Sequence, residues 1–191
     1  MLLLAGISGS AAASRAIDGE FPGEITATGP VTFTSALLTV VSLITLRGSI
    51  HRSILKVTGS LVGTVTDCRS SLGTAVGLGI SVAIGCALSL PWHLRYVGYI
   101  GTLPRILSVE IEILNIGFLL RDLPFGGTVF NCLYQGNIRA TFTENPGDRI
   151  RLSEASSIPT TTPRGAGCAE NPSGTVRGTG ILERRHGYRL L

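Results

Sequence analysis

Short runs rich in β-branched residues, separated by glycine, proline and asparagine, fill the sequence from Glu24 to Leu182. Such runs are typical of strands joined by turns. The pattern predicts an all-β domain, either an antiparallel β-sandwich or a partly closed barrel of about ten strands. The expected strands cover residues 26–28, 31–34, 37–46, 50–57, 59–66, 76–84, 94–100, 106–116, 128–134, 138–143 and 175–182, with a turn at Gly29–Pro30 between the first two.

Three segments are expected along the chain. Residues 1–23 read as the remnant of an export signal and a flexible N-terminus, residues 24–183 as a single β domain, and residues 184–191 as a basic C-terminal tail. Hydrophobic residues make up 44% of the chain, which suffices for a sizeable core. Residues 144–167 are rich in Ser, Thr, Pro and Gly, so we expect a long loop there.

The first residues resemble the end of a signal peptide. Leu2–Ile7 supplies six residues of an apolar stretch, and Ala11 and Ala13 fit a cleavage site after Ala13. A complete signal peptide has a basic start and about 7 to 15 apolar residues, whereas the first basic residue here is Arg15. We infer a start codon assigned too late, and expect a secreted, extracellular or cell-envelope protein.

Four cysteines, an even number in a chain with export features, indicate disulfide bonds. No C-x-x-C pair occurs and the three histidines lie far from the cysteines in sequence, so the ligand spacing of a zinc site is missing. Three pairings remain open in principle. We favour Cys132 with Cys168, which closes a loop of about 36 residues, and by elimination Cys68 with Cys86.

Two windows without charge, Ile25–Leu46 and Ser70–Trp92, are long enough to cross a bilayer as helices. Gly73 and Gly77 in the second window form a G-x-x-x-G pattern, which packs helices in membranes. However, both windows contain proline and several Gly, Ser or Thr residues, unlike a Leu-rich span. A small helical membrane protein therefore stays a second alternative, and membrane contact is not expected.

Most catalytic and binding motifs are missing from the sequence. It contains no G-x-S-x-G nucleophile elbow, and the only lysine, Lys56, does not belong to a phosphate-binding loop. A net charge of +4 without a basic stripe interleaved with aromatic residues is a poor footprint for nucleic acid. We therefore expect no catalytic residue, metal, cofactor or nucleic-acid partner, and an enzyme is not favoured.

Two strands nevertheless carry candidate site residues. Glu110 and Glu112 share one face, about 7 Å apart, as an acid and base flanking a glycosidic bond would be. A solvated face with arginine partners on neighbouring strands explains them better. Trp92 and Tyr96 also share a face and are the candidate ligand-binding residues, because an aromatic strip can stack on a sugar. The core face of a strand is again the favoured interpretation.

The strand expected at 106–116 has a strict alternation. One face is expected to be solvated and the other to pack in the core, because side chains alternate with a period of two. The solvated face holds Ile106, Ser108, Glu110 and Glu112, and the core face holds Leu107, Val109, Ile111 and Ile113.

Four short segments carry a resemblance to a known group of proteins. They are Leu90–Tyr96, Gly101–Pro104, Thr45–Gly48 and Cys132–Tyr134. In these segments the chain resembles small, β-rich, functionally uncharacterised exported proteins of high-GC Gram-positive bacteria. The resemblance implies export and an all-β fold, and it supplies no catalytic residues. It also places a cysteine near Val41 as the partner of Cys68, so valine at this position leaves the pairing of Cys68 with Cys86 open.

Taken together, these features favour a secreted or cell-envelope protein with a non-enzymatic structural or surface-interaction role. The expected partner is a cell-envelope polysaccharide or another surface protein. The alternative is a secreted module that binds a glycan, or less plausibly acts on one, through Trp92 and Tyr96.

Overall fold

The computed structural model describes the backbone of residues 17–19, 23–35, 38–51, 57–77, 81–86, 89–102, 105–122, 131–143, 149–152, 157–164, 173–184 and 188–190. Side chains are described for residues 23–35, 38–51, 57–77, 81–86, 89–101, 107–121, 132–143, 151 and 174–181. Outside these ranges lie residues 1–16 and 20–22 of the expected signal remnant and flexible N-terminus (residues 1–23), as does Cys168.

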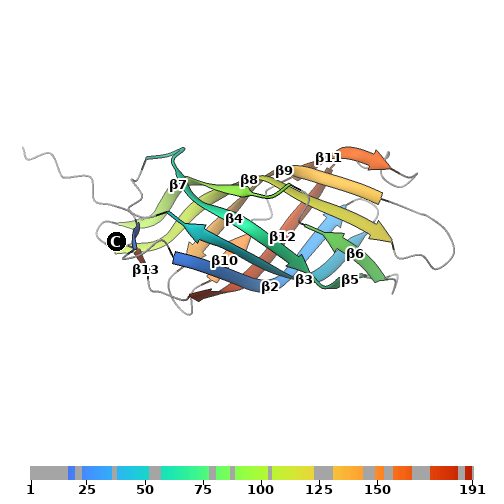
Figure 1. Ribbon diagram of the computed structural model, residues 1–191, viewed down its shortest axis with the longest axis horizontal. Coiled ribbons are helices and arrows are strands. Elements are labelled where there is room, and N and C mark those ends of the chain that lie inside the picture. Colours follow the sequence, from blue (N-terminus) through green and yellow to red (C-terminus); the bar gives the residue numbers. More distant parts are fainter. Residues whose placement is uncertain are drawn as a thin grey trace, which may run out of the picture.

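All regular elements in the described part of the chain are strands, which confirms the all-β prediction (Figure 1). They are β1 (Ile17–Gly19), β2 (Gly23–Ser35), β3 (Thr39–Ile50), β4 (Leu61–Ser70), β5 (Leu72–Ala75), β6 (Ser81–Gly85), β7 (Trp92–Thr102), β8 (Arg105–Asp122), β9 (Asn131–Thr143), β10 (Arg149–Leu152), β11 (Ser157–Arg164), β12 (Ser173–Arg184) and β13 (Tyr188–Leu190).

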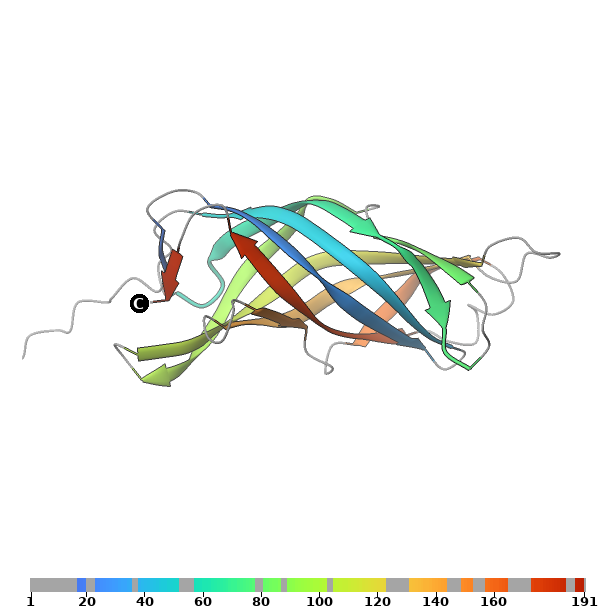
Figure 2. The same cartoon turned by 90° about the horizontal axis from the view of Figure 1, so that it is seen from below.

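The strands pair antiparallel in a ladder that returns to its starting point, so the sheet forms a partly closed barrel. The order around the wall is β2, β3, β4 with β5, β7 with β6, β8, β9, β10 with β11, and β12, which pairs again with β2. Figure 2 shows β12, β2 and β3 side by side and strongly tilted across one wall. Such closure pairs most of the strand edges that an open sheet would expose.

The turn expected at Gly29–Pro30 does not exist, because both residues lie in the middle of β2. They keep their pairing with β3, opposite Ile44 and Leu43. On the other side the ladder with β12 skips them, running from Gly178 opposite Val31 directly to Ile181 opposite Thr28. Proline has no N–H to donate, so it interrupts the barrel seam without ending the strand.

The prediction of a long loop at residues 144–167 is also wrong in part, because β10 and β11 lie within this range. Both strands pair with β9 on one side and β12 on the other, so they complete the ring. The expected pair of strands at 128–134 and 138–143 is the single strand β9 where it is described. Conversely, Val76 and Gly77 form a turn between β5 and β6 rather than starting a strand.

The inner face of the wall forms one apolar core. Along β2 and β3 the burial alternates with a period of two, and Phe33, Val40, Trp92 and Tyr134 are at most 2% exposed. Glycines let the elements approach closely: a Cβ on Gly174 would lie 2.2 Å from Cζ of Phe33.

In β8 the expected alternation holds from Val109 to Ile113 but fails before Val109. Leu107 is exposed and Ser108 is buried, the reverse of the expectation. The pairing with β7 shifts here, since Ile100 lies opposite Ser108 and Gly101 opposite Ile106. The extra residue, Leu107, forms a bulge that reverses the faces locally.

Neither uncharged window is helical in its described residues. The first folds as β2 and most of β3, and the second contains β5 and β6. No helix long and apolar enough to cross a membrane occurs in the part of the chain that was searched. The two terminal segments meet in a separate two-stranded sheet, where β1 pairs with β13, so residues 188–190 of the expected tail form a strand.

Candidate functional site

Trp92 and Tyr96 are core residues, and the aromatic surface expected from them is not present. Both side chains point from β7 to the inside of the barrel, where Trp92 is 0% and Tyr96 3% exposed. A ring without an exposed face cannot stack on a sugar that arrives from solvent. The favoured interpretation, the core face of a strand, is the one that the structure supports.

Trp92 is held by a chain of hydrogen bonds that explains its place. Its Nε1 donates to Oγ of Ser89 at 2.8 Å, and that hydroxyl donates to the carbonyl oxygen of Asn115 at 2.8 Å. Asn115 has a φ of 56°, a left-handed conformation that asparagine tolerates, and its N–H donates to Oδ1 of Asn137 at 3.0 Å. The indole N–H is thereby satisfied in the core.

Glu110 and Glu112 lie on the outer face, as expected, and their surroundings are those of a solvated face. Nε of Arg95 on β7 donates to Oε2 of Glu112 at 3.0 Å, and a second contact joins the two through Nη2. On the other side Glu112 faces Arg139 of β9 in the ladder. A carboxylate between two cross-strand arginines stabilises the sheet, as expected of a solvated face.

The cavities that described residues line inside the barrel leave little room for a ligand. Two cavities inside the barrel, lined by described residues of β2, β3 and their neighbours, have volumes of about 20 and 10 Å³. Each holds about one water molecule. Among the residues whose side chains are described, no group of three or more His, Cys, Asp or Glu side chains could hold a metal ion.

Two parts of the outer surface differ in charge. One part, here called the charged wall, comprises the outward residues His93 and Arg95 of β7, Glu110 and Glu112 of β8, and Arg139 of β9. The other, here called the uncharged face, comprises Thr28, Pro30, Thr32 and Thr34 of β2, Thr39, Val41, Leu43 and Thr45 of β3, Leu72 and Thr74 of β5, and the adjoining Val76. Neighbouring strands place these residues next to one another, because Pro30 lies opposite Leu43 and Val41 opposite Thr74.

Apolar side chains form the centre of the uncharged face. Val41, Leu43, Leu72 and Val76 are 37%, 51%, 63% and 60% exposed. Contiguous exposed apolar groups of this kind mark contact sites more often than isolated ones do.

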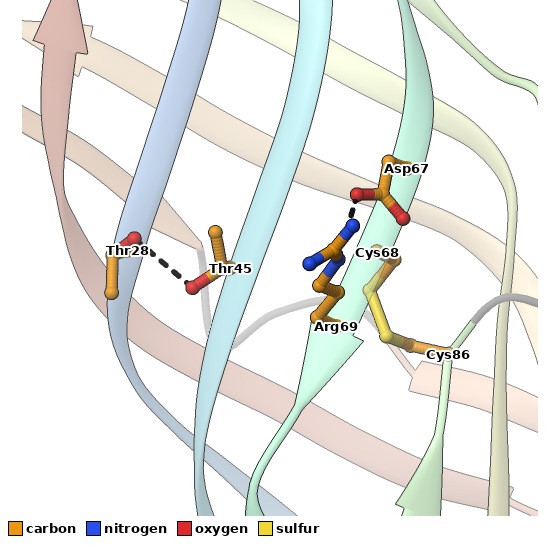
Figure 3. A network of polar contacts seen from close by, with 6 residues as sticks. All are labelled: Thr28, Thr45, Asp67, Cys68, Arg69 and Cys86. Atoms are coloured by element: carbon orange, nitrogen blue, oxygen red, sulfur yellow. Dashed lines mark hydrogen bonds and ion pairs between the residues drawn. A yellow bond between two sulfur atoms is a disulfide. The ribbon is translucent and has the colours of Figure 1, made fainter.

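Two cross-strand threonine pairs flank this centre. Oγ1 of Thr28 and Oγ1 of Thr45 lie 3.1 Å apart, and Thr39 donates to Oγ1 of Thr34 at 3.3 Å. Figure 3 shows the first pair near the ion pair of Asp67 with Arg69 on β4, where the uncharged face ends. The hydroxyls in each pair are therefore hydrogen-bonded to each other across the two strands.

The Cys68–Cys86 disulfide expected by elimination is present and joins β4 to the residue after β6 (Figure 3). Cys132 is also disulfide-bonded, while its expected partner Cys168 lies outside the described residues. A hollow of about 310 Å³ lies beside the Cys68–Cys86 bond. The residues that line the hollow belong to β4, β6 and β8 or follow β6 directly. Because these strands are far apart in sequence, no sequence motif predicts the hollow.

No family model, curated protein or solved structure matches the chain.

Proposed function

We propose that this is a non-enzymatic interaction protein, secreted or held in the cell envelope, that binds another surface protein through the uncharged face. The observation that carries the proposal is the contrast between a packed interior and an outer face that gathers Val41, Leu43, Leu72 and Val76 without a charge. Protein interfaces have cores depleted of charge. The disulfide bond and the resemblance to small exported proteins support a location outside the cytoplasm.

A protein partner fits this face better than a glycan. Glycan-binding surfaces use aromatic rings, and Trp92 and Tyr96 are both buried. The uncharged face holds only aliphatic side chains, threonines and one proline. Such groups pack against the aliphatic side chains of another protein and offer a sugar no ring to stack on.

A pair of matched leucine substitutions tests the proposal. Leu43 on β3 is 51% exposed and Leu107 on β8 is 61% exposed, but only Leu43 lies in the uncharged face. Labelled wild-type protein, Leu43→Asp and Leu107→Asp are added to washed cells that produce the protein, and the bound label is measured. We expect Leu43→Asp to lose binding and Leu107→Asp to keep it, with both variants folded by circular dichroism.

Pretreatment of the cells separates the two partner classes. Protease treatment of the cells should remove the binding. After digestion of the wall polysaccharide, the labelled protein should still bind to the proteins that the digestion releases. Binding that survives Leu43→Asp would refute the role of this face. Binding that resists protease and disappears on polysaccharide digestion would replace the protein partner by the glycan alternative.

A further inference from the structure

The barrel wall is interrupted where β4 and β6 pass each other. Residues 61–65 of β4 pair with β7, and residues 72–74 of β5 pair with β6. Between these two ladders no pair joins residues 66–71 to residues 84–86. Two links cross the opening instead: the Cys68–Cys86 bond, with Cα atoms 5.8 Å apart, and a hydrogen bond from the Ser70 hydroxyl to the carbonyl oxygen of Ile84.

This opening holds the hollow of about 310 Å³. Its volume falls at the lower end of the roughly 300 to 1,000 Å³ of small-molecule sites. The lining residues are Cys68, Ser70, Ala83, Ile84, Gly85, Cys86, Leu119 and Arg121. Because Ile84 and both cysteines are buried, the disulfide and the Ile84 side chain separate the hollow from the core.

The lining combines one cation with apolar surface. Arg121 is exposed, and the two ion pairs formed among the described residues, Asp67 with Arg69 and Arg95 with Glu112, do not include it. No Asp or Glu belongs to the lining. On β4, the Asp67 carboxylate is already bonded to Arg69. The guanidinium is therefore available to an anion from solvent.

We propose that this hollow binds a small anionic amphiphile, a carboxylate with a short aliphatic chain. The carboxylate accepts hydrogen bonds from Arg121 at the rim, and the chain packs on Leu119, Ala83 and the disulfide. The site is separate from the uncharged face on β2, β3 and β5, and the proposal does not depend on the protein partner inferred above.

Octanoate is the probe, titrated into the whole oxidised protein by calorimetry and by NMR. We expect saturable binding and shifts of the Ala83 and Leu119 amides, with amides of Val41 and Leu43 unchanged. Arg121→Gln keeps much of the side-chain stem and removes the charge, and should raise the Kd at least about tenfold. The matched control is Arg47→Gln, which removes an exposed cation on β3 and should leave the Kd unchanged.

Acetate and octanol separate the two halves of the ligand, and each should bind at least about tenfold more weakly than octanoate. Ala83→Phe fills the hollow and should also abolish binding. The proposal is overturned if octanoate shows no saturable binding up to about 10 mM. It is equally overturned if Arg121→Gln binds like the wild type, or if the shifted amides lie on β3.

Discussion

The uncharged face and the charged wall cover the same core but differ in the side chains that they expose to solvent. Beneath the first lie Phe33 and Val40, and beneath the second lie Trp92 and Ile111, all at most 2% exposed. Outside, threonines and aliphatic residues cover one wall, and arginines with glutamates cover the other. The inward half of each strand therefore determines the barrel, while the outward half is free to differ from wall to wall.

If the two walls share one core, truncating a large core side chain beneath either wall should lower the free energy of unfolding by the same amount. Phe33→Ala and Trp92→Ala should each lower the free energy of unfolding by about 3 to 5 kcal/mol, because each leaves a cavity in a packed interior. Urea unfolding followed by circular dichroism measures both. A loss below about 1 kcal/mol for one of them, against several for the other, would mean that the walls do not share a core.

The disulfide at the wall opening should have the next largest effect. Cys68 and Cys86 are separated by 18 residues, and a cross-link closing a loop of this size stabilises by about 3 kcal/mol in the chain-entropy model. The Cys68→Ala/Cys86→Ala double variant should lose about that amount, with the barrel spectrum retained. The same stability in variant and wild type under non-reducing conditions would show that the bond does not constrain the wall.

The ion pair on the charged wall should contribute less and should depend on salt. Arg95 and Glu112 side chains are 41% and 21% exposed, and exposed pairs contribute about 0.2 to 1 kcal/mol. Glu112→Gln should therefore lose at most about 1 kcal/mol at low salt, and the difference should shrink as NaCl is added. The matched change on the uncharged face, Thr28→Val with Thr45→Val, should show no salt dependence.

A pH effect should mark the core beneath the charged wall. Burial raises the pKa of Tyr96 above its usual 10.0, and the nearby Tyr99 adds to the rise. The stabilisation that this raised pKa gives is complete below pH 10.0 and is lost as the pH rises through the folded-state pKa. Unfolding free energies measured in steps above pH 10.0 should fall less steeply for Tyr96→Phe than for the wild type, and parallel slopes would contradict this.

The sequence predicted the inner half of this comparison better than the outer half. Alternation along β8 from Val109 to Ile113 and the shared face of Trp92 and Tyr96 follow from local period alone. The closure of β12 on β2 is a pairing between the two ends of the domain, which no local pattern reveals. Gly29–Pro30 has the composition of a turn, but pairing with β3 on one side keeps it within a strand.

The candidate sites were harder to predict because each is assembled from several strands. Leu43 and Leu72 become neighbours only through the pairing of β3 with the strands that follow it, and the hollow at Arg121 combines β4, β6 and β8. The prediction of a loop at residues 144–167 was wrong in part for the same reason, because pairing with strands on both sides stabilises β10 and β11. Residue type and spacing within one strand do not indicate which other strands will lie beside it.

The central claim is that the uncharged face makes the contact with the partner, and site-specific photo-crosslinking tests it most directly. A residue with a benzophenone side chain replaces Leu43 or Leu107 in the protein made by the producing cells, and the cells are then irradiated. The account predicts a discrete protein adduct from Leu43 that unlabelled wild-type protein competes away, and none from Leu107. An adduct from Leu107 alone, or no competable adduct from Leu43 in a folded protein, would contradict it.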